Sequence, residues 1–161
     1  MNVEAARLCA REQQITAEWI ASHQQPSGEI LWSYDGKSDP WDHVHAAMGL
    51  TVLGRVDAAR AAYRFLASIQ EPNGAFAAER VGGHVTRMSH ETNHAAYIAT
   101  GAWHFYCATG DHDFLAELWP SVERAINWVV SLQLPSGAIA WEDFLDAESA
   151  ALHLAISGDL D

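Results

Sequence analysis

One short pattern occurs three times in the chain and constrains its fold more than any other feature. The pattern reads aromatic, aliphatic, any residue, Ser, any residue, Gln, any residue, Pro, Ser or Asn, Gly, any residue, apolar. Its copies cover residues 19–30, 65–76 and 128–139. Repeats of this kind predict a fold in which similar units stack on one another and share a hydrophobic core.

Each copy of the repeat closes a segment with helical periodicity. Before the third copy, apolar residues recur at steps of three and four: Leu115, Leu118, Val122, Ala125, Ile126 and Val129. Polar residues take the other face, so the segment is predicted to be an amphipathic outer helix. Because proline disrupts a helix interior, we expect a short turn capped by Asp113 and a main helix beginning near Pro120. Asp57 is the expected N-cap of the preceding outer helix.

A second kind of helix is predicted after the glycine of each copy. Segments 44–53, 92–109 and 146–156 are rich in Ala, Gly, Met and aromatic residues, which indicates inner helices buried on most sides. Outer and inner helices would alternate along the chain. The predicted fold class is therefore all-α, an α/α toroid of three helical hairpins, half of a six-hairpin barrel. We also expect the repeated Gln to hydrogen-bond to the adjacent hairpin.

Length and composition narrow the range of partners. The 161 residues predict one domain, 1–161, and three hairpins predict that it is incomplete at the C-terminus or completed by self-association through an open toroid edge. A formal net charge of −12 argues against a nucleic-acid partner. Cys9 and Cys107 lack a CxxC spacing, and we expect both to be reduced, buried thiols. No apolar run has the length of a membrane span, and the expected location is cytoplasmic.

The repeat resembles that of a known family. Segments 60–76 and 124–139 each contain a basic and a small residue, an aromatic–aliphatic pair, Gln, and a final Gly-Ala-apolar triplet. This is similar to the QW repeat of triterpene cyclases and prenyltransferases, and segments 39–48 and 96–101 resemble actinobacterial prenyltransferase-like proteins. The resemblance implies a prenyltransferase-like or terpenoid-cyclase-like protein acting on an isoprenoid or polyprenyl-linked substrate in a central cavity.

The sequence has the repeat of that family but lacks its catalytic motifs. Segment 141–146 lacks the DxDD motif of protonating cyclases, and the surroundings of Cys107 do not reproduce the zinc ligands of protein prenyltransferases. No cofactor is therefore assigned. A diphosphate would have to contact Arg80, His84 or Arg87, near the glycine pair 82–83.

Two alternatives stay open beside the isoprenoid hypothesis, so whether the chain is an enzyme is undecided at this point. Segment 109–128 resembles six-hairpin glycosidases such as glucoamylases, which implies a carbohydrate substrate and paired catalytic carboxylates such as Asp42, Glu91 or Glu142. The second alternative is a non-catalytic helical repeat module whose open edge binds a protein.

The most informative polar residues begin the first two inner helices. Aligning these helices by their Ala pairs places His45 with His94 and Asp42 with Glu91. Each helix thus begins with a carboxylate and a His three residues later, on one face. Three interpretations remain: acid–base catalysis, a divalent metal site, and helix capping at a polar rim.

The loops between outer and inner helices are expected to gather at one end of the toroid with further acidic and aromatic residues. The candidate catalytic residues are Asp42, His45, Glu91, His94, Glu142 and Asp143. The candidate substrate-binding residues are Trp32, Tyr34, Trp41, Tyr97 and Trp141. Aromatic faces beside carboxylates suit stacking on sugars and also stabilise carbocations, so these residues fit both enzyme hypotheses.

Overall fold

The computed structural model describes residues 3–143 of the chain. In this range it contains five helices: α1 (Val3–Ser22), α2 (Pro40–Val52), α3 (Val56–Ser68), α4 (Thr92–Thr109) and α5 (His112–Ser131). It also contains five short strands: β1 (Lys37–Ser38), β2 (Glu79–Val81), β3 (His84–Arg87), β4 (His90–Glu91) and β5 (Glu142–Asp143). The third predicted inner helix, 146–156, lies outside the described residues.

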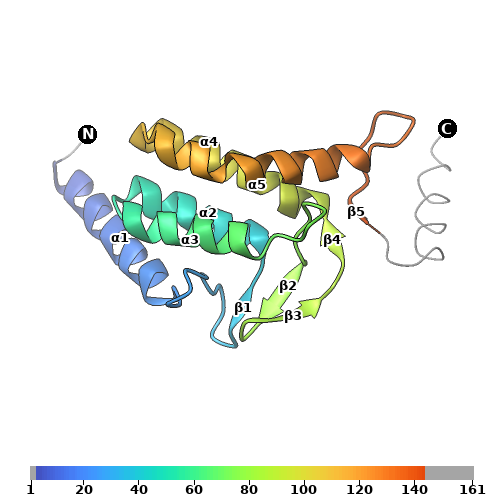
Figure 1. Ribbon diagram of the computed structural model, residues 1–161. Helices are drawn as coiled ribbons and strands as arrows, with labels where there is room; N and C mark the ends of the chain where they lie inside the picture. The colour runs from blue at the N-terminus through green and yellow to red at the C-terminus, as the bar shows by residue number, and fades with distance from the viewer. Residues whose placement is uncertain (1–2, 144–161) are drawn as a thin grey trace.

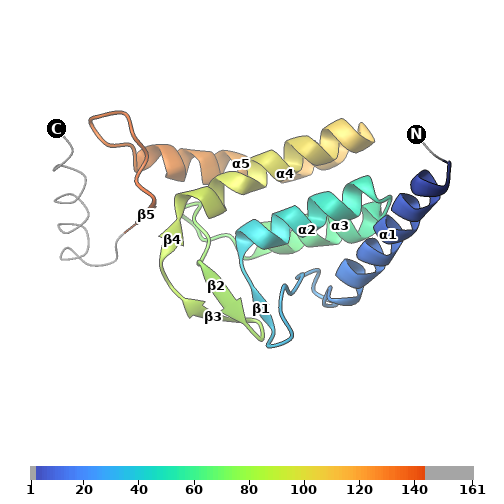
Figure 2. The same ribbon diagram turned by 180° about the vertical axis from the view of Figure 1, so that it is seen from behind.

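The helices form two layers, as the alternation of helix types predicts. Figure 1 shows α3 and α5 in front, and Figure 2 shows α2 and α4 in front when the molecule is seen from behind. Helix α2 packs against both α3 and α4, and α4 packs against α5. The alternation of outer and inner helices holds for α2 to α5, whereas an α/α toroid of three helical hairpins stays a prediction.

The strands are a departure from the predicted all-α class. Strands β1, β2 and β3 form an antiparallel sheet in that order, and β4 pairs antiparallel with β5. They lie together at one end of the helices (Figure 1). Gly82 and Gly83, both with positive φ, form the two-residue turn between β2 and β3, as hairpins of this length require. Strands of two to four residues are too short to produce a recognisable alternating pattern.

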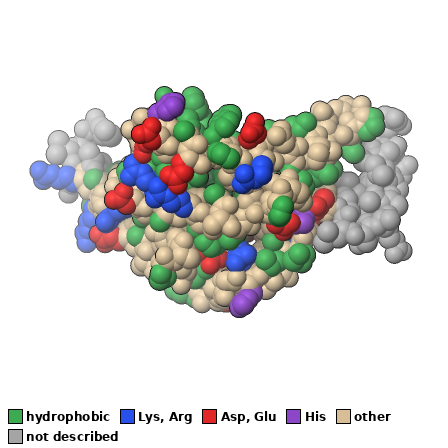
Figure 3. Space-filling model, viewed as in Figure 1, with side chains coloured by type: hydrophobic (Ala, Val, Ile, Leu, Met, Phe, Trp, Pro, Cys, Tyr) green, Lys and Arg blue, Asp and Glu red, His purple; other side chains and the backbone are tan. Residues whose placement is uncertain are grey.

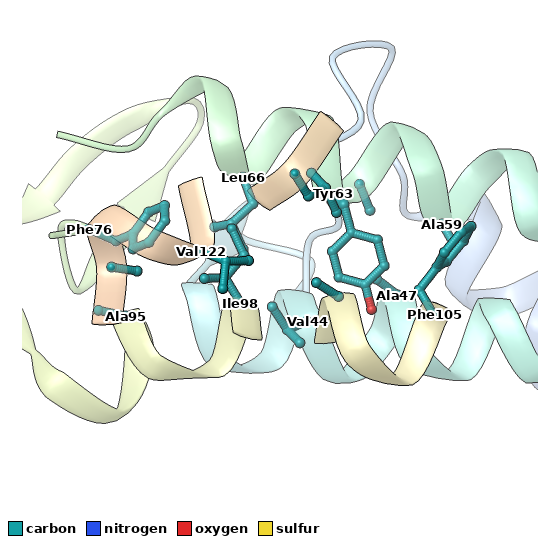
Figure 4. Close-up of a cluster of buried hydrophobic side chains, with 14 of the residues drawn as sticks. Val44, Ala47, Ala59, Tyr63, Leu66, Phe76, Ala95, Ile98, Phe105 and Val122 are labelled. Atoms are coloured by element: carbon teal, nitrogen blue, oxygen red, sulfur yellow. The ribbon is translucent and has the colours of Figure 1, made fainter. Parts of the chain in front are cut away.

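A hydrophobic core fills the space between the two helix layers. Tyr63 and Leu66 of α3 meet Ile98 and Phe105 of α4, and all four side chains are buried (Figure 4). Gly101 lies where α4 packs against α2, beneath the Tyr63 ring of α3, and a Cβ there would be 2.7 Å from both Tyr63 Cε1 and Val44 Cγ1. The close approach of the helices explains a glycine in the middle of α4.

The repeated Gln forms the expected link between hairpins. Gln24 Nε2 donates to the carbonyl of Ala58 in α3 at 2.8 Å, and Gln70 Nε2 donates to the carbonyl of Ser121 in α5 at 2.9 Å. Each Gln also donates to the carbonyl of the glycine in its own turn. We call this arrangement of Gln, turn and neighbouring helix the repeat clasp.

The repeat glycine allows this close contact. Gly28 and Gly74 have φ values of 97° and 100°, a region that side chains rarely adopt. A Cβ at either position would overlap with a backbone carbonyl of the next outer helix, at Ala61 or Arg124. The glycine therefore serves both the turn and the packing of the hairpins.

Two expectations about the outer helices are wrong. Helix α5 is continuous through Pro120. Proline has no N–H to donate to the Ala116 carbonyl, but both residues are exposed, so water can bind to that carbonyl instead. Asp111, rather than Asp113, caps this helix by accepting a hydrogen bond from the N–H of Phe114 at 3.0 Å.

The start of α3 also differs from the prediction. Its N-cap is Arg55, which makes no side-chain capping bond, and Asp57 lies in the first turn, where it pairs with Arg60 at 2.9 Å. Arg60 reaches Asp111 of α5 as well, at 2.6 Å. Figure 3 shows Lys and Arg beside Asp and Glu over this outer face.

Two composition-based expectations can also be compared with the structure. Cys9 and Cys107 are free thiols but exposed, so the expectation of burial was wrong. No helix within residues 3–143 is long and apolar enough to cross a membrane.

Candidate functional site

The N-terminal ends of the inner helices α2 and α4 meet and bring four aromatic and histidine side chains together. Trp41 stacks on Tyr97 with ring centroids 5.0 Å apart, and its edge faces His94 at 6.4 Å. Tyr97 Oη shares a hydrogen bond of 2.6 Å with His45 Nε2. We call Trp41, His45, His94 and Tyr97 the aromatic–histidine cluster.

Asp42 adjoins this cluster in the first turn of α2. Its backbone N–H donates to Asp39 Oδ1 at 2.8 Å, which identifies Asp39 as the N-cap of the helix. Asp42 is an exposed residue, but partial desolvation and the neighbouring charge of Asp39 raise the pKa of its carboxyl, and His45 and His94 partly oppose this shift. The capping interpretation therefore applies to Asp39, and Asp42 is left with an environment that raises its carboxyl pKa.

Glu91 holds the equivalent position before α4 but has different neighbours. It is 7% exposed and makes no side-chain capping bond. Its Oε1 lies 2.8 Å from a guanidinium nitrogen of Arg87, and its Oε2 lies 3.4 Å from His94 Nε2. The carboxylate thus stands between a permanent cation and a buried imidazole.

His94 is buried between the two inner helices. Burial lowers the pKa of its imidazole, Glu91 and Asp42 raise it, and Arg87 lowers it, with a net decrease. Among the described residues its Nδ1 has no hydrogen-bond partner. His94 therefore favours the neutral form and offers a polar atom at the cluster.

The β4–β5 pair divides the remaining candidate acids between two faces. Glu91 lies opposite Glu142, and His90 lies opposite Asp143. Successive side chains on a strand point to opposite faces. Glu142 therefore shares the face of Glu91, and Arg87 contacts it at 3.1 Å.

The structure places Asp143 in a separate group with His90. The His90 ring lies 2.8 Å from Asp143 through Nδ1 and 3.0 Å from Glu71 through Nε2. Burial lowers the pKa of His90, but the hydrogen bonds to Asp143 and Glu71 raise it more, and the net shift is upward. This group joins the loop after α3 to β5.

The three other aromatic candidates occupy exposed positions outside the cluster. Trp32 lies under the ammonium of Lys37, 5.8 Å from its ring centroid, and Tyr34 is 91% exposed beside His23. Trp141 is exposed next to Glu142, and its carbonyl accepts a hydrogen bond from the Thr92 N–H at 2.8 Å. Only Trp141 is therefore adjacent to the candidate acids.

Sequence reasoning missed two roles, those of Asp39 and Arg87. Asp39 precedes a proline at the first helical position, which is a recognisable N-cap signal. Arg87 was considered only for a diphosphate, but its guanidinium is engaged by Glu91 and Glu142. That pairing depends on the register of β4 and β5, for which the sequence holds no local signal.

Buried polar groups beside the site serve the scaffold. His43 accepts from the Ile30 N–H at Nδ1 and is 2.8 Å from the Ala62 carbonyl through Nε2, so its ring is neutral. Burial lowers its pKa accordingly. Glu29 is also buried and accepts a hydrogen bond from Ser38. Over residues 3–143 no group of three or more His, Cys, Asp or Glu could hold a metal ion.

Comparisons with known proteins identify the relatives of this chain. Residues 37–155 match the family model of the mannosylglycerate hydrolase MGH1-like glycoside hydrolase domain. The chain is 44% identical over 126 residues to the MMP endo-(1,4)-3-O-methyl-alpha-D-mannosidase of Mycolicibacterium hassiacum. The match covers 78% of this chain and 35% of the relative, so the chain spans about a third of that protein.

The fold of this chain is similar to part of a solved glucanase structure. The endo-beta-1,4-glucanase CMCax from Acetobacter xylinum superposes with a TM-score of 0.58 at 13% sequence identity. The superposition covers 75% of this chain and 39% of the glucanase. At this identity the likeness shows the fold alone.

These comparisons support the glycosidase alternative and lend no support to the prenyltransferase or cyclase hypothesis. The family match includes α2, α4 and the strands that carry the aromatic–histidine cluster and its neighbouring acids. The chain belongs to the MGH1-like family of glycoside hydrolase domains.

Proposed function

We propose that the chain acts as a glycoside hydrolase domain that cleaves an α-mannosidic linkage, with Asp42 as the proton donor. One observation carries this proposal: Asp42 has a raised carboxyl pKa directly beside the stacked rings of Trp41 and Tyr97. The α-mannoside is suggested by the 44% identical relative, which is named as a mannosidase.

The environment of Asp42 suits a general acid. Such a group must hold its proton near the working pH and release it to the glycosidic oxygen in the transition state. Burial and the charge of Asp39 shift the pKa of Asp42 in the required direction. Glycosidases commonly pair such an acid with a second carboxylate. The candidates are Glu91 and Glu142, which lie on the same face of the β4–β5 pair.

The aromatic–histidine cluster suits a sugar ring. The stacked pair Trp41–Tyr97 offers an apolar face against which the C–H groups of a pyranose can pack. His45, which is exposed, supplies an imidazole at its edge that can exchange hydrogen bonds with sugar hydroxyls. Apolar stacking with polar atoms at the rim is the usual composition of a small-ligand site.

The decisive experiment measures hydrolysis of two α-mannosides by the 161-residue chain. The substrates are an α-1,4-linked oligosaccharide of 3-O-methylmannose and mannosylglycerate, and released reducing sugar is quantified. Asp42→Asn should lower kcat/KM by about 10²- to 10⁴-fold, because it removes the transferable proton. Asp113→Asn, at an exposed position in the first turn of α5, is the matched control and should retain the wild-type rate.

Binding is measured in parallel by isothermal titration calorimetry with the same two substrates. Asp42→Asn should still bind the cleaved substrate, since it preserves the Trp41–Tyr97 stack. Wild-type turnover by the Asp42→Asn variant would refute the assignment of the acid. Failure of the wild-type chain to bind or cleave either α-mannoside would refute the proposed function.

A further inference from the structure

Arg87 joins two glutamates that face each other across the β4–β5 pair. One guanidinium nitrogen lies 2.8 Å from Glu91 Oε1, and the other lies 3.1 Å from Glu142 Oε2. The two glutamates are directly opposite in the strand register. Like charges at such a position repel each other, and the forked guanidinium, with donors on two nitrogens, can offset both.

The ion pairs of Arg87 contribute little to folding stability by themselves. The side chain of Arg87 is 51% exposed, and exposed pairs are weakened by water and salt. Glu91 and His94, by contrast, are both buried, so interactions between them are screened much less. The main effect of Arg87 is therefore expected on its buried neighbours.

Glu91 is shared between Arg87 and His94. Its Oε1 takes the short contact with Arg87, and its Oε2 keeps the longer 3.4 Å contact with His94 Nε2. On the other side of His94 lie the ring of Trp41 and the carboxyl of Asp42, both from α2. The charged groups that act on His94 are thus Glu91, Arg87 and Asp42.

We propose that Arg87 is a positioning residue: by holding Glu91, it prevents a full ion pair between Glu91 and His94 and keeps the imidazole neutral beside Asp42. This inference rests on the proposed function in one respect, the assignment of Asp42 as the general acid. A cationic His94 would stabilise the ionised form of Asp42 and so oppose proton storage there.

The direction of each electrostatic effect agrees with this role. Burial and Arg87 lower the pKa of His94, whereas Glu91 and Asp42 raise it. His94 in turn lowers the pKa of Asp42. Loss of Arg87 should consequently raise the pKa of His94, and protonated His94 should then depress the pKa of Asp42.

The test is a pH titration of His94 by NMR, with its imidazole resonances assigned by comparison with His94→Gln. Arg87→Gln should raise the apparent pKa of His94 by about half a pH unit or more, since a single charge at this distance has an effect of that order. Arg87→Lys keeps the cation and should stay closer to the wild type. Arg64→Gln, which removes a bidentate pair with Glu117 on the outer face, should leave His94 unchanged.

A double variant separates electrostatics from structural damage. The double variant Arg87→Gln/Glu91→Gln removes two charges that act on the His94 pKa in opposite directions. The apparent pKa of His94 in this variant should be lower than in Arg87→Gln alone. An unchanged His94 titration in folded Arg87→Gln would overturn the inference. So would an equal upward shift in Arg64→Gln, because the effect would then not depend on Glu91.

The activity profile provides a second readout. The pKa of a general acid sets the alkaline limb of the kcat/KM profile, so Arg87→Gln should move that limb to lower pH, and Arg87→Lys should largely restore it. An alkaline limb that stays in place in Arg87→Gln would contradict the link to Asp42. If the wild-type chain cleaves neither mannoside, the proposed function fails, while the His94 titration still decides the role of Arg87.

Discussion

At the scale of single residues, sequence reasoning named the acidic and histidine side chains but not the contacts that join them. Aligning the two Ala pairs identified Asp42, His45 and His94 as candidates from their positions at the helix starts. Arg87 and Asp143 depend on strand pairing between positions about 50 residues apart in the chain. Such register is set by the assembled fold, and no local pattern encodes it.

His90 provides a pH-dependent prediction at this scale. Its pKa is raised in the folded protein by Asp143 and Glu71, so its stabilising effect is fully present below the unfolded pKa of about 6.5. The effect is lost as pH rises through the raised pKa. Thermal unfolding should therefore show His90→Gln less stable than the wild type by a few degrees at pH 6.

The gap between the two proteins should narrow at pH 9, where His90 is neutral in both the folded and unfolded chain. His112→Gln, at an exposed position at the start of α5, is the control and should show no comparable change with pH. A gap that is equal at pH 6 and pH 9 would contradict a charged His90.

At the scale of elements, helices were predicted well because their signals are long and local. The expected inner helix 92–109 has the observed bounds of α4, and the outer helices end at the repeat turns. The short strands were missed, and Pro120 was wrongly expected to mark the start of the main helix. Its cost is limited where the unpaired carbonyl of Ala116 faces water, a condition that depends on which side of α5 is exposed.

Gly101 allows a prediction for the packing of α4 against α2 and the Tyr63 side chain of α3. Gly101→Ala should lower the free energy of unfolding by about 1–3 kcal/mol, because the added methyl group would collide with Tyr63 and Val44. Gly49→Ala is the matched control: its Cβ would lie 3.7 Å from Ile20, an ordinary contact, so higher helix propensity should stabilise α2. Urea denaturation measures both. Stabilisation by Gly101→Ala would show that the helices can move apart at little cost.

At the scale of the whole molecule, the repeat specifies how hairpins attach to one another. Gln70 links the second and third copies, since it donates to the Ser121 carbonyl and accepts from the Ser121 hydroxyl at 2.7 Å and from Arg124. The sequence repeat was enough to predict this link. It could not reveal whether a full ring forms, because ring closure depends on contacts beyond any single repeat.

Gln70→Ala should therefore destabilise the fold. The expected loss is about 1–3 kcal/mol, because the partly buried hydroxyl of Ser121 loses its acceptor and its carbonyl loses a donor. Gln25→Ala is the control, since the Gln25 side chain makes only an exposed 3.4 Å contact with the His23 carbonyl. Equal urea midpoints for the two variants would argue against the repeat clasp as a stabilising joint.

The repeat clasp accommodates different lengths of chain between its copies. Its three Gln residues are separated by 46 and then 63 positions, yet Gln24 and Gln70 make the same two kinds of hydrogen bond. The difference in length is taken up partly by the helices and partly by the segment before each inner helix, which includes the β2–β3 hairpin in the second repeat. The joints between hairpins are therefore the same although the chain between them differs in length.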